Sequence, residues 1–234
     1  MNKWKESELV RSLLGFFLLF LLFVGLFIFV VPSTHQSSKI AEKIKSIKNE
    51  KVTYVAIGDS LTQGVGDSSN QGGFVPVLSQ SLESDFDWQV TSRNYGIAGN
   101  TSNQILKRMQ EKKDIQRDLK KAKVMTLTVG GNDVIHVIKD NITNLNVDTF
   151  TKPAQAYQKR LGQIIELARK DNKTLPIYIV GIYNPFYLNF PEMTEMQTIV
   201  DNWNQSTEEV CKKYDNVYFV PVNDLLYKGI DGKG

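Results

Sequence analysis

The sequence predicts an α/β protein with a doubly wound parallel sheet of five strands, preceded by one membrane-spanning helix. Short apolar segments alternate with segments whose apolar residues recur at helical spacing, as in a parallel sheet that helices cover on both faces. Leu13 to Val31 is an uncharged run of mostly Leu, Phe, Val and Ile, close to the ~20 residues that a helix needs to cross a bilayer. The chain has 234 residues, 41% of them apolar, which is enough for one domain with its own core.

Five segments are predicted to be the strands of the sheet. The first, from Val52 to Ile57, consists of β-branched, aromatic and small residues, as expected for a strand buried on both faces. Gly58 then permits the sharp turn that ends this strand. The other four strands are predicted at 88–94, 124–129, 176–181 and 217–222.

Helices are predicted between the strands, where apolar residues fall on one helical face. Thr101 and Gln104 have the spacing of a capping box that opens a helix through Met109. Two further helices are predicted at about 157–169 and 195–214. An earlier helix is predicted to pack on the sheet through Phe74, Val77, Leu78 and Leu82.

The apolar run predicts an uncleaved anchor in the cell membrane, crossed once, with the domain outside the cytoplasm. Lys3, Lys5 and Arg11 precede the run, so the positive-inside tendency keeps residues 1–12 in the cytoplasm and sends the rest outward. A cleaved signal peptide, which would release a secreted protein, is the alternative. Its apolar region is usually ~7–15 residues and ends at a small-x-small site, of which the sequence after Val31 offers only a poor example.

These assignments divide the chain into segments and exclude some partners. Residues 13–31 are the anchor, 32–51 a lysine-rich linker, and 52–234 the domain. A net charge of +3 is too small to indicate a nucleic-acid partner. The lone Cys211 excludes an internal disulfide and a cysteine-based metal cluster. The absence of a Gly-x-x-x-x-Gly-Lys or Gly-x-Gly-x-x-Gly motif counts against a nucleotide-binding domain.

Ser60 is the candidate nucleophile. It follows the end of the first strand, and in an open α/β sheet ligands bind outside the carboxyl ends of the strands. Asp59 is interpreted as a capping or loop residue, because adjacent side chains seldom point the same way. The alternative is that Asp59 or Ser60 merely caps the next helix.

Two later stretches also look like sharp strand exits that carry glycine and asparagine, Asn94–Ser102 and Leu127–Val134. With residues 52–62 they resemble, in order and spacing, the GDSL or SGNH family of serine esterases and lipases. The resemblance covers about residues 52–222. It implies the SGNH hydrolase fold, a flavodoxin-like parallel sheet flanked by helices, and no metal or organic cofactor.

The same resemblance assigns roles to three residues. Ser60 would attack a carboxylic ester, such as a lipid, acyl or acetylated-glycan ester. The backbone N–H groups of Ser60 and Gly99 and the side-chain amide of Asn132 would stabilise the oxyanion. Turn formation is the alternative role for Gly99 and Asn132. The expected partners are an ester substrate and, through the N-terminal helix, the lipid bilayer; the oligomeric state is left open.

The family's closing Asp-x-x-His block, which supplies the base and its orienting carboxylate, is absent. Asp231 lies near the end of the sequence, and the residues after it are Gly-Lys-Gly. Removing the histidine of a serine protease costs on the order of 10⁶ in turnover, so a very poor hydrolase with a C-terminally incomplete domain is expected. A catalytically inactive surface domain that binds acyl or glycan groups is the alternative.

Neither histidine is expected to replace the missing base. His35 lies in the linker, and His136 is expected on a helical face that points away from Ser60. Asp133 is expected to open that helix. The aromatic segment Tyr183–Phe190 is interpreted as a wall of the acyl site, a lid or simple packing.

Overall fold

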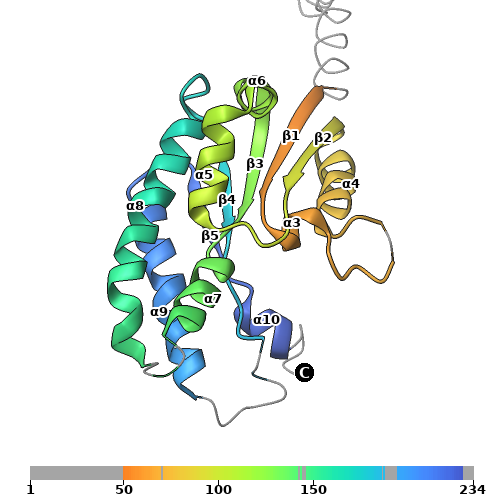
Figure 1. Cartoon of the computed structure of the whole chain (residues 1–234). Coiled ribbons are helices and arrows are strands. Elements are labelled where there is room, and N and C mark those ends of the chain that lie inside the picture. Colours follow the sequence, from red (N-terminus) through yellow and green to blue (C-terminus); the bar gives the residue numbers. More distant parts are fainter. Residues whose placement is uncertain are drawn as a thin grey trace, which may run out of the picture. The chain divides into compact units, whose positions relative to one another are not determined.

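A five-stranded parallel sheet with the order β2-β1-β3-β4-β5 frames the domain (Figure 1). The strands are β1 (Lys51–Gly58), β2 (Gln89–Gly96), β3 (Ala122–Thr128), β4 (Ile177–Val180) and β5 (Val217–Val220). All five predicted strands are therefore confirmed. The computed structural model describes residues 50–69, 71–141, 143, 146–185, 187 and 194–228.

The strand order reverses next to β1, which pairs with β2 on one side and with β3 on the other. In such sheets the crevice for ligands opens where the order reverses, at the carboxyl ends of the strands. Tyr54, Val55, Ala56 and Ile57 of β1 are fully buried, which confirms that this strand is central. The ends of β1 and β3 are consequently the expected place for a site.

Gly58 is the last residue of β1, but the need for glycine at this position has a different cause from the predicted sharp turn. Its backbone does not have the positive φ that favours glycine. A Cβ at this position would lie 2.1 Å from Oγ1 of Thr128 and 2.5 Å from Oγ1 of Thr62, well inside van der Waals contact. Glycine is required here because β3 and the next helix approach the backbone closely.

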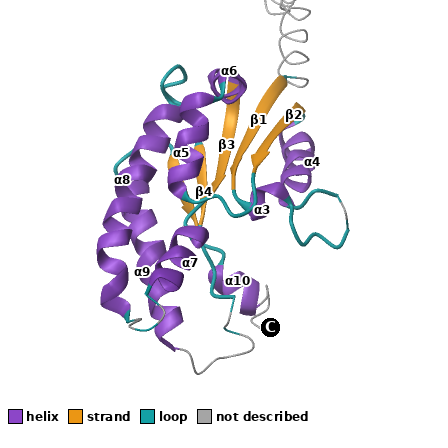
Figure 2. Ribbon diagram, in the orientation of Figure 1, coloured by secondary structure: helices purple, strands orange, loops and turns teal. Residues whose placement is uncertain are grey.

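In the described part of the chain, α-helices cover one face of the sheet, as Figure 2 shows. They are α5 (Ser102–Glu111), α6 (Lys113–Lys121), α8 (Thr151–Ala168) and α9 (Thr194–Cys211). They pack over the larger hydrophobic core, which includes buried residues of β1, β3 and β4. The predicted helices at 157–169 and 195–214 are confirmed, although α8 begins earlier, and α6 was not predicted.

The other face is covered less completely than predicted. In the described residues α4 (Phe74–Phe86) packs over β1 and β2 there, with Val75 buried and Leu78 and Leu82 packed against a small core. Val77, predicted to face the sheet, is 54% exposed. Beyond α4, Tyr178 and Tyr218 are 38% and 45% exposed. The expectation of two covered faces is thus confirmed for one face and only in part for the other.

Further helices in the described residues include those near the carboxyl ends of the strands, which are α3 (Ser60–Gln63), α7 (Gly131–Asp140) and α10 (Asn223–Lys228) (Figure 1). The 3₁₀ helix η1 (Val147–Phe150) leads into α8. At the start of α5, Oε1 of Gln104 accepts from the Thr101 N–H at 2.9 Å, as the capping-box prediction requires.

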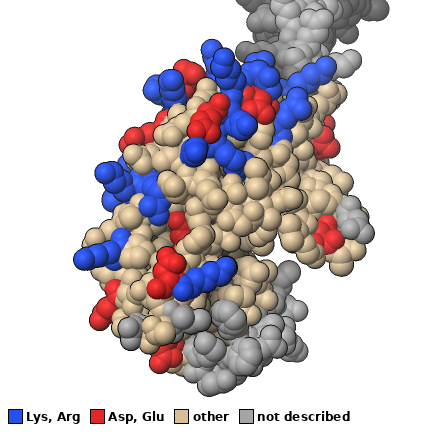
Figure 3. Space-filling model, in the orientation of Figure 1, with Lys and Arg blue, Asp and Glu red and all other residues tan. Residues whose placement is uncertain are grey.

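On one face of the domain, basic side chains gather near the other end. Figure 3 shows Lys and Arg gathered in the upper part of the view, around α6, whose sequence is Lys-Asp-Ile-Gln-Arg-Asp-Leu-Lys-Lys. No helix in the described residues is long and apolar enough to cross a membrane. The predicted anchor at 13–31 lies outside those residues, so it stays a prediction.

Candidate active site

Ser60 is the first residue of the short helix α3, directly after β1. Asp59 is the N-cap, and its carboxylate accepts from the N–H of Leu61 at 3.1 Å. The capping role predicted for Asp59 is therefore confirmed.

A buried hydrogen-bond cluster joins the ends of β1 and β3 beside Ser60. The hydroxyl of Thr128 donates to the Asp59 carboxylate at 2.8 Å and lies 2.7 Å from the hydroxyl of Thr62. Asp59, Thr62 and Thr128 are all 5% exposed or less. The two threonines were not predicted as site residues. Hydroxyl side chains within or beside an apolar strand are nevertheless a usable signal, because buried polar groups need partners.

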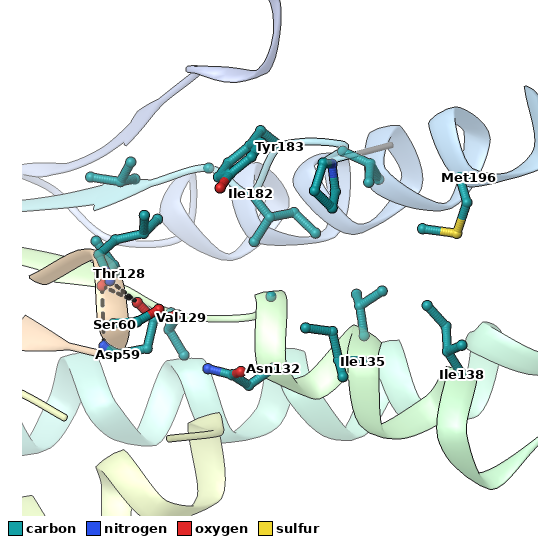
Figure 4. A pocket seen from close by; sticks show the side chains of 17 residues that line it. Asp59, Ser60, Thr128, Val129, Asn132, Ile135, Ile138, Ile182, Tyr183 and Met196 are labelled. Atoms are coloured by element: carbon teal, nitrogen blue, oxygen red, sulfur yellow. Dashed lines mark hydrogen bonds between the residues drawn. The ribbon is translucent and has the colours of Figure 1, made fainter. Parts of the chain in front are cut away.

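Ser60 and Asn132 line the same cavity, which encloses about 230 Å³. In Figure 4, Ser60 and Thr128 lie at one end, Ile138 and Met196 at the other, and the side-chain amide of Asn132 extends toward the Ser60 end. The walls between them are mostly aliphatic. They are formed by Val129, Val134, Ile135, Ile138, Val180, Ile182, Met196 and Val200.

Gly99 lies in the loop 97–101 between β2 and α5, and it is not among the residues that line the cavity. Its φ of +79° is in the left-handed region that favours glycine, and no heavy atom lies within 4 Å of the position of a Cβ. The loop is tied to α3, because the N–H of Ala98 donates to Oε1 of Gln63 at 2.6 Å.

The loop is also tied to α7. Nδ2 of Asn132 donates to the carbonyl of Asn100 at 3.0 Å. A side-chain amide has two N–H donors, so this bond orients the group and leaves its second donor for a ligand. The structure thus brings Ser60 and Asn132 to one cavity and places Gly99 in the loop that connects to both of their helices.

Asp133 lies in the first turn of α7, but its carboxylate does not cap that helix. It accepts from the N–H and the hydroxyl of Ser102, at 2.8 and 2.6 Å, and from Nη2 of Arg160 at 3.1 Å. Nε of Arg160 donates to the hydroxyl oxygen of Ser102 at 2.7 Å. Arg160 did not figure in the sequence analysis, because no local pattern announces a partner on another helix.

Arg108 fastens the neighbouring strand ends. Its guanidinium donates to the carbonyls of Tyr95 and Gly58 at 3.0 and 3.2 Å. Partial burial lowers the pKa of the Arg108 guanidinium, which nevertheless stays charged at neutral pH. The carboxyl ends of β1 and β2 are therefore held together next to the site.

The remaining predicted site residues fall in several places. His136 is exposed on α7 and does not line the cavity. Tyr183 and Pro185 line it, whereas Asn184 is buried and Phe190 lies outside the described residues. Among the described residues that line the cavity none is a histidine.

Comparisons with known proteins agree with this arrangement. The family model described as the GDSL-like Lipase/Acylhydrolase family matches residues 56–233. The chain is 33% identical over 201 residues to the uncharacterised protein YpmR of Bacillus subtilis (strain 168), covering 85% of this chain and 78% of YpmR. It is 30% identical over 183 residues to the spore germination lipase LipC of Bacillus licheniformis, covering 75% and 82% of the two chains.

A solved structure supports the fold. The lipase Lip_vut3 from a goat rumen metagenome matches with a TM-score of 0.67 and 23% identity, over 76% of this chain and 84% of that one. The family match spans most of the chain and includes the ends of β1 and β3, where Ser60 and Asn132 lie. This chain therefore belongs to the GDSL-like lipase/acylhydrolase family of ester-hydrolysing enzymes.

Proposed function

We propose that the domain acts outside the cytoplasm on carboxylic esters with aliphatic acyl groups, and that Ser60 is the nucleophile. The observation that carries this proposal is the shared cavity, in which a hydroxyl and an amide lie at one end of an aliphatic pocket. Such a pocket, largely apolar with a few polar groups placed at one end, is typical of a small-molecule site.

In the proposed reaction Oγ of Ser60 attacks the ester carbonyl carbon and its proton passes to a base. The oxyanion that forms accepts hydrogen bonds from the backbone N–H groups of Ser60 and Gly99 and from the amide of Asn132. The alcohol then leaves, and water releases the acid from the serine. Loss of one oxyanion donor commonly costs ~10²–10³ in turnover.

No histidine among the described residues that line the cavity can act as the base for Ser60. A serine hydroxyl needs a neighbouring acceptor for its proton, and His35 and His136 are the two histidines of this sequence. His136 does not line the cavity. We therefore expect slow turnover, because Ser60 must pass its proton to water, and loss of the histidine of a serine protease costs on the order of 10⁶ in turnover.

The cavity favours acyl chains longer than acetyl. The volume of about 230 Å³ is well above the ~10–15 Å³ that one water molecule needs, so the cavity has room for an acyl chain of several carbons. An acetyl group would leave the aliphatic end near Ile138 and Met196 empty, and so would lose the favourable burial of apolar surface.

A series of p-nitrophenyl esters from two to twelve carbons tests both points. We expect the release of p-nitrophenol to be fastest for acyl chains of several carbons and to be severalfold slower in Ser60→Ala, which lacks the attacking oxygen. Equal release by Ser60→Ala would refute the role of Ser60. A maximum at acetyl would refute the assignment of the acyl pocket while leaving ester hydrolysis intact.

A binding domain is the second candidate, favoured by the lack of a histidine among the described lining residues. It would hold an acyl group in the same pocket without cleaving it. Calorimetric titration with octanoate separates the two functions, since a binding domain gives micromolar affinity together with p-nitrophenol release no faster than in Ser60→Ala.

The proposed location rests on the uncharged run from Leu13 to Val31 and the basic residues before it. Protease added to intact cells should remove the domain and leave the N-terminal segment in the membrane fraction. A domain that resists protease until the cells are opened would contradict this orientation.

A further inference from the structure

A network of three polar side chains lies behind the two proposed oxyanion donors, outside the set that lines the cavity. Ser102 is the first residue of α5, Asp133 lies in the first turn of α7, and Arg160 comes from α8. Ser102 and Asp133 are 0% and 7% exposed, and the side chain of Arg160 is 26% exposed. The network is thus largely shielded from water. Hydrogen bonds and ion pairs are electrostatically stronger in such an environment than in water.

The contacts within the network close on one another. The Ser102 hydroxyl donates to Asp133 and accepts from Nε of Arg160, while Nη2 of Arg160 reaches the same Asp133 oxygen. Two donors of one planar guanidinium therefore bridge two helices at once. Lysine, with a single ammonium group on a flexible stem, does not reproduce this fork.

The network lies next to both proposed donors along the chain. Asp133 follows Asn132, and Ser102 follows the loop 97–101 that contains Gly99. The two hydrogen bonds from Ser102 to Asp133 therefore fasten the end of that loop to the start of α7, beside the bond from Asn132 to the carbonyl of Asn100.

We infer that Arg160 is a positioning residue, which holds Ser102 against Asp133 and so sets the distance between the Gly99 N–H and the Asn132 amide. The inference rests on the proposed function of these donors. Arg160 touches no part of the cavity, so it does not act on the substrate directly. A misplacement of about 1 Å at a reacting centre can cost on the order of 10²-fold in rate.

The test measures covalent labelling of Ser60 by an alkyl fluorophosphonate, followed by intact-protein mass spectrometry. In this reaction a bond forms between Oγ of Ser60 and phosphorus, the phosphorus–fluorine bond breaks, fluoride leaves, and the serine proton passes to buffer. The phosphoryl oxygen takes the place of the oxyanion. We expect Arg160→Ala to lower the maximal labelling rate by roughly 10- to 100-fold while the half-saturating probe concentration changes less than about twofold.

Two comparisons separate positioning from general destabilisation. Arg169 donates three hydrogen bonds to the carbonyls of Leu175 and Asn216, at the amino ends of β4 and β5, so Arg169→Ala is the matched control and should label at the wild-type rate. In an Asn132→Ala background the effect of Arg160→Ala should shrink, because one donor that it positions is already gone. Arg160→Lys should restore little of the rate.

The outcomes are distinct. If wild type is not labelled, or Ser60→Ala is labelled equally fast, the proposed function fails and the inference fails with it. If Ser60 is labelled but Arg160→Ala keeps the wild-type rate, only the inference is refuted. It is also refuted if Arg169→Ala lowers the labelling rate as much as Arg160→Ala does. The same holds if Arg160→Ala lowers the rate by an undiminished factor in the Asn132→Ala background. Should Arg160→Ala not fold, Ser102→Ala removes the same bridge and carries the same expectations.

Discussion

Thr128 shows how much one residue at a strand end contributes. Its hydroxyl donates to the buried Asp59 carboxylate, accepts from the Asp59 N–H at 3.2 Å and lies 2.7 Å from the Thr62 hydroxyl. The hydroxyl of Thr126, two residues earlier on β3, lies 2.7 Å from the neutral hydroxyl of Tyr54. Hydrogen bonds to charged groups contribute about 1.5–3 kcal/mol and neutral ones about 1 kcal/mol. We therefore expect Thr128→Val to lower the free energy of unfolding by about 2 kcal/mol, and Thr126→Val by about half as much.

Urea denaturation of both variants measures this difference. The two substitutions remove the same hydroxyl from the same strand, so the strand propensity of valine cancels in the comparison. Equal losses, or a larger loss in Thr126→Val, would mean that the Asp59 carboxylate does not depend on Thr128.

At this scale the sequence predicted residue types better than their partners. Ser60 stands out because it follows the end of a strand, whereas Gly99 and Asn132 were assigned roles by the resemblance to the GDSL family. Ser60 and Asn132 do lie on one cavity. Arg160 lies in the middle of a helix, and its partners are 58 and 27 residues away. Contacts of that kind are set by how helices pack, which no local pattern records.

Among the elements, the loop between α3 and α4 depends on a single carboxylate. Asp67 accepts hydrogen bonds from the hydroxyl of Ser69 and from the backbone N–H groups of Ser69, Gln71, Gly72 and Gly73. The Ser69 hydroxyl and these N–H groups hold the pKa of Asp67 well below its usual range. The charged carboxylate thus orders a glycine-rich segment that follows the Ser60 helix.

The direction of the shift fixes the pH dependence of this loop. A carboxyl whose pKa is depressed by folding contributes fully above its unfolded pKa of about 3.9 and loses that contribution as the pH falls toward the lower folded value. Protection of the Gln71, Gly72 and Gly73 amides from hydrogen exchange, corrected for the intrinsic rate, should therefore stay constant from pH 7 to pH 4. In Asp67→Asn the protection of these amides should fall severalfold even at pH 7. Asp85→Asn removes an equal charge from the surface of α4 and should leave the protection unchanged. Unchanged protection in Asp67→Asn would show that the loop is ordered without the carboxylate.

Elements were predicted where apolar patterns are strong. β1 and β3 are runs of mostly buried residues, and α5, α8 and α9 bury regular stripes. The missed helix α6 has only Ile115 and Leu119 as apolar residues, so its pattern is too weak to recognise. Val77 was placed on the wrong face of α4 because the helix turns Val75 toward the sheet instead.

Across the described domain, the candidate active site and the exposed apolar surface lie in different places. The cavity opens at the carboxyl ends of β1 and β3, and the basic residues of α6 gather at the opposite end. A second apolar hollow lies between α4 and the exposed side of β3, β4 and β5. We call this hollow the open sheet face; it includes Val77, Phe86, Trp88, Tyr178, Val180 and Val220.

The open sheet face should bind a hydrophobic dye in the folded protein. Its aromatic side chains are partly exposed and stacked, with ring centroids 4.7 Å apart for Phe86 and Trp88. Apolar patches of this kind are unusual on soluble monomers and attract apolar ligands. We expect anilinonaphthalene sulfonate to fluoresce with the native domain, and Val77→Lys to reduce that signal by about half or more. The free energy of unfolding should change by no more than about 0.5 kcal/mol, because Val77 is 54% exposed.

Leu225→Lys, at a 59% exposed position on α10 outside the open sheet face, is the matched control and should leave the fluorescence unchanged. A native domain that binds no dye would show that this face is covered in solution, and equal losses in both variants would place the dye elsewhere.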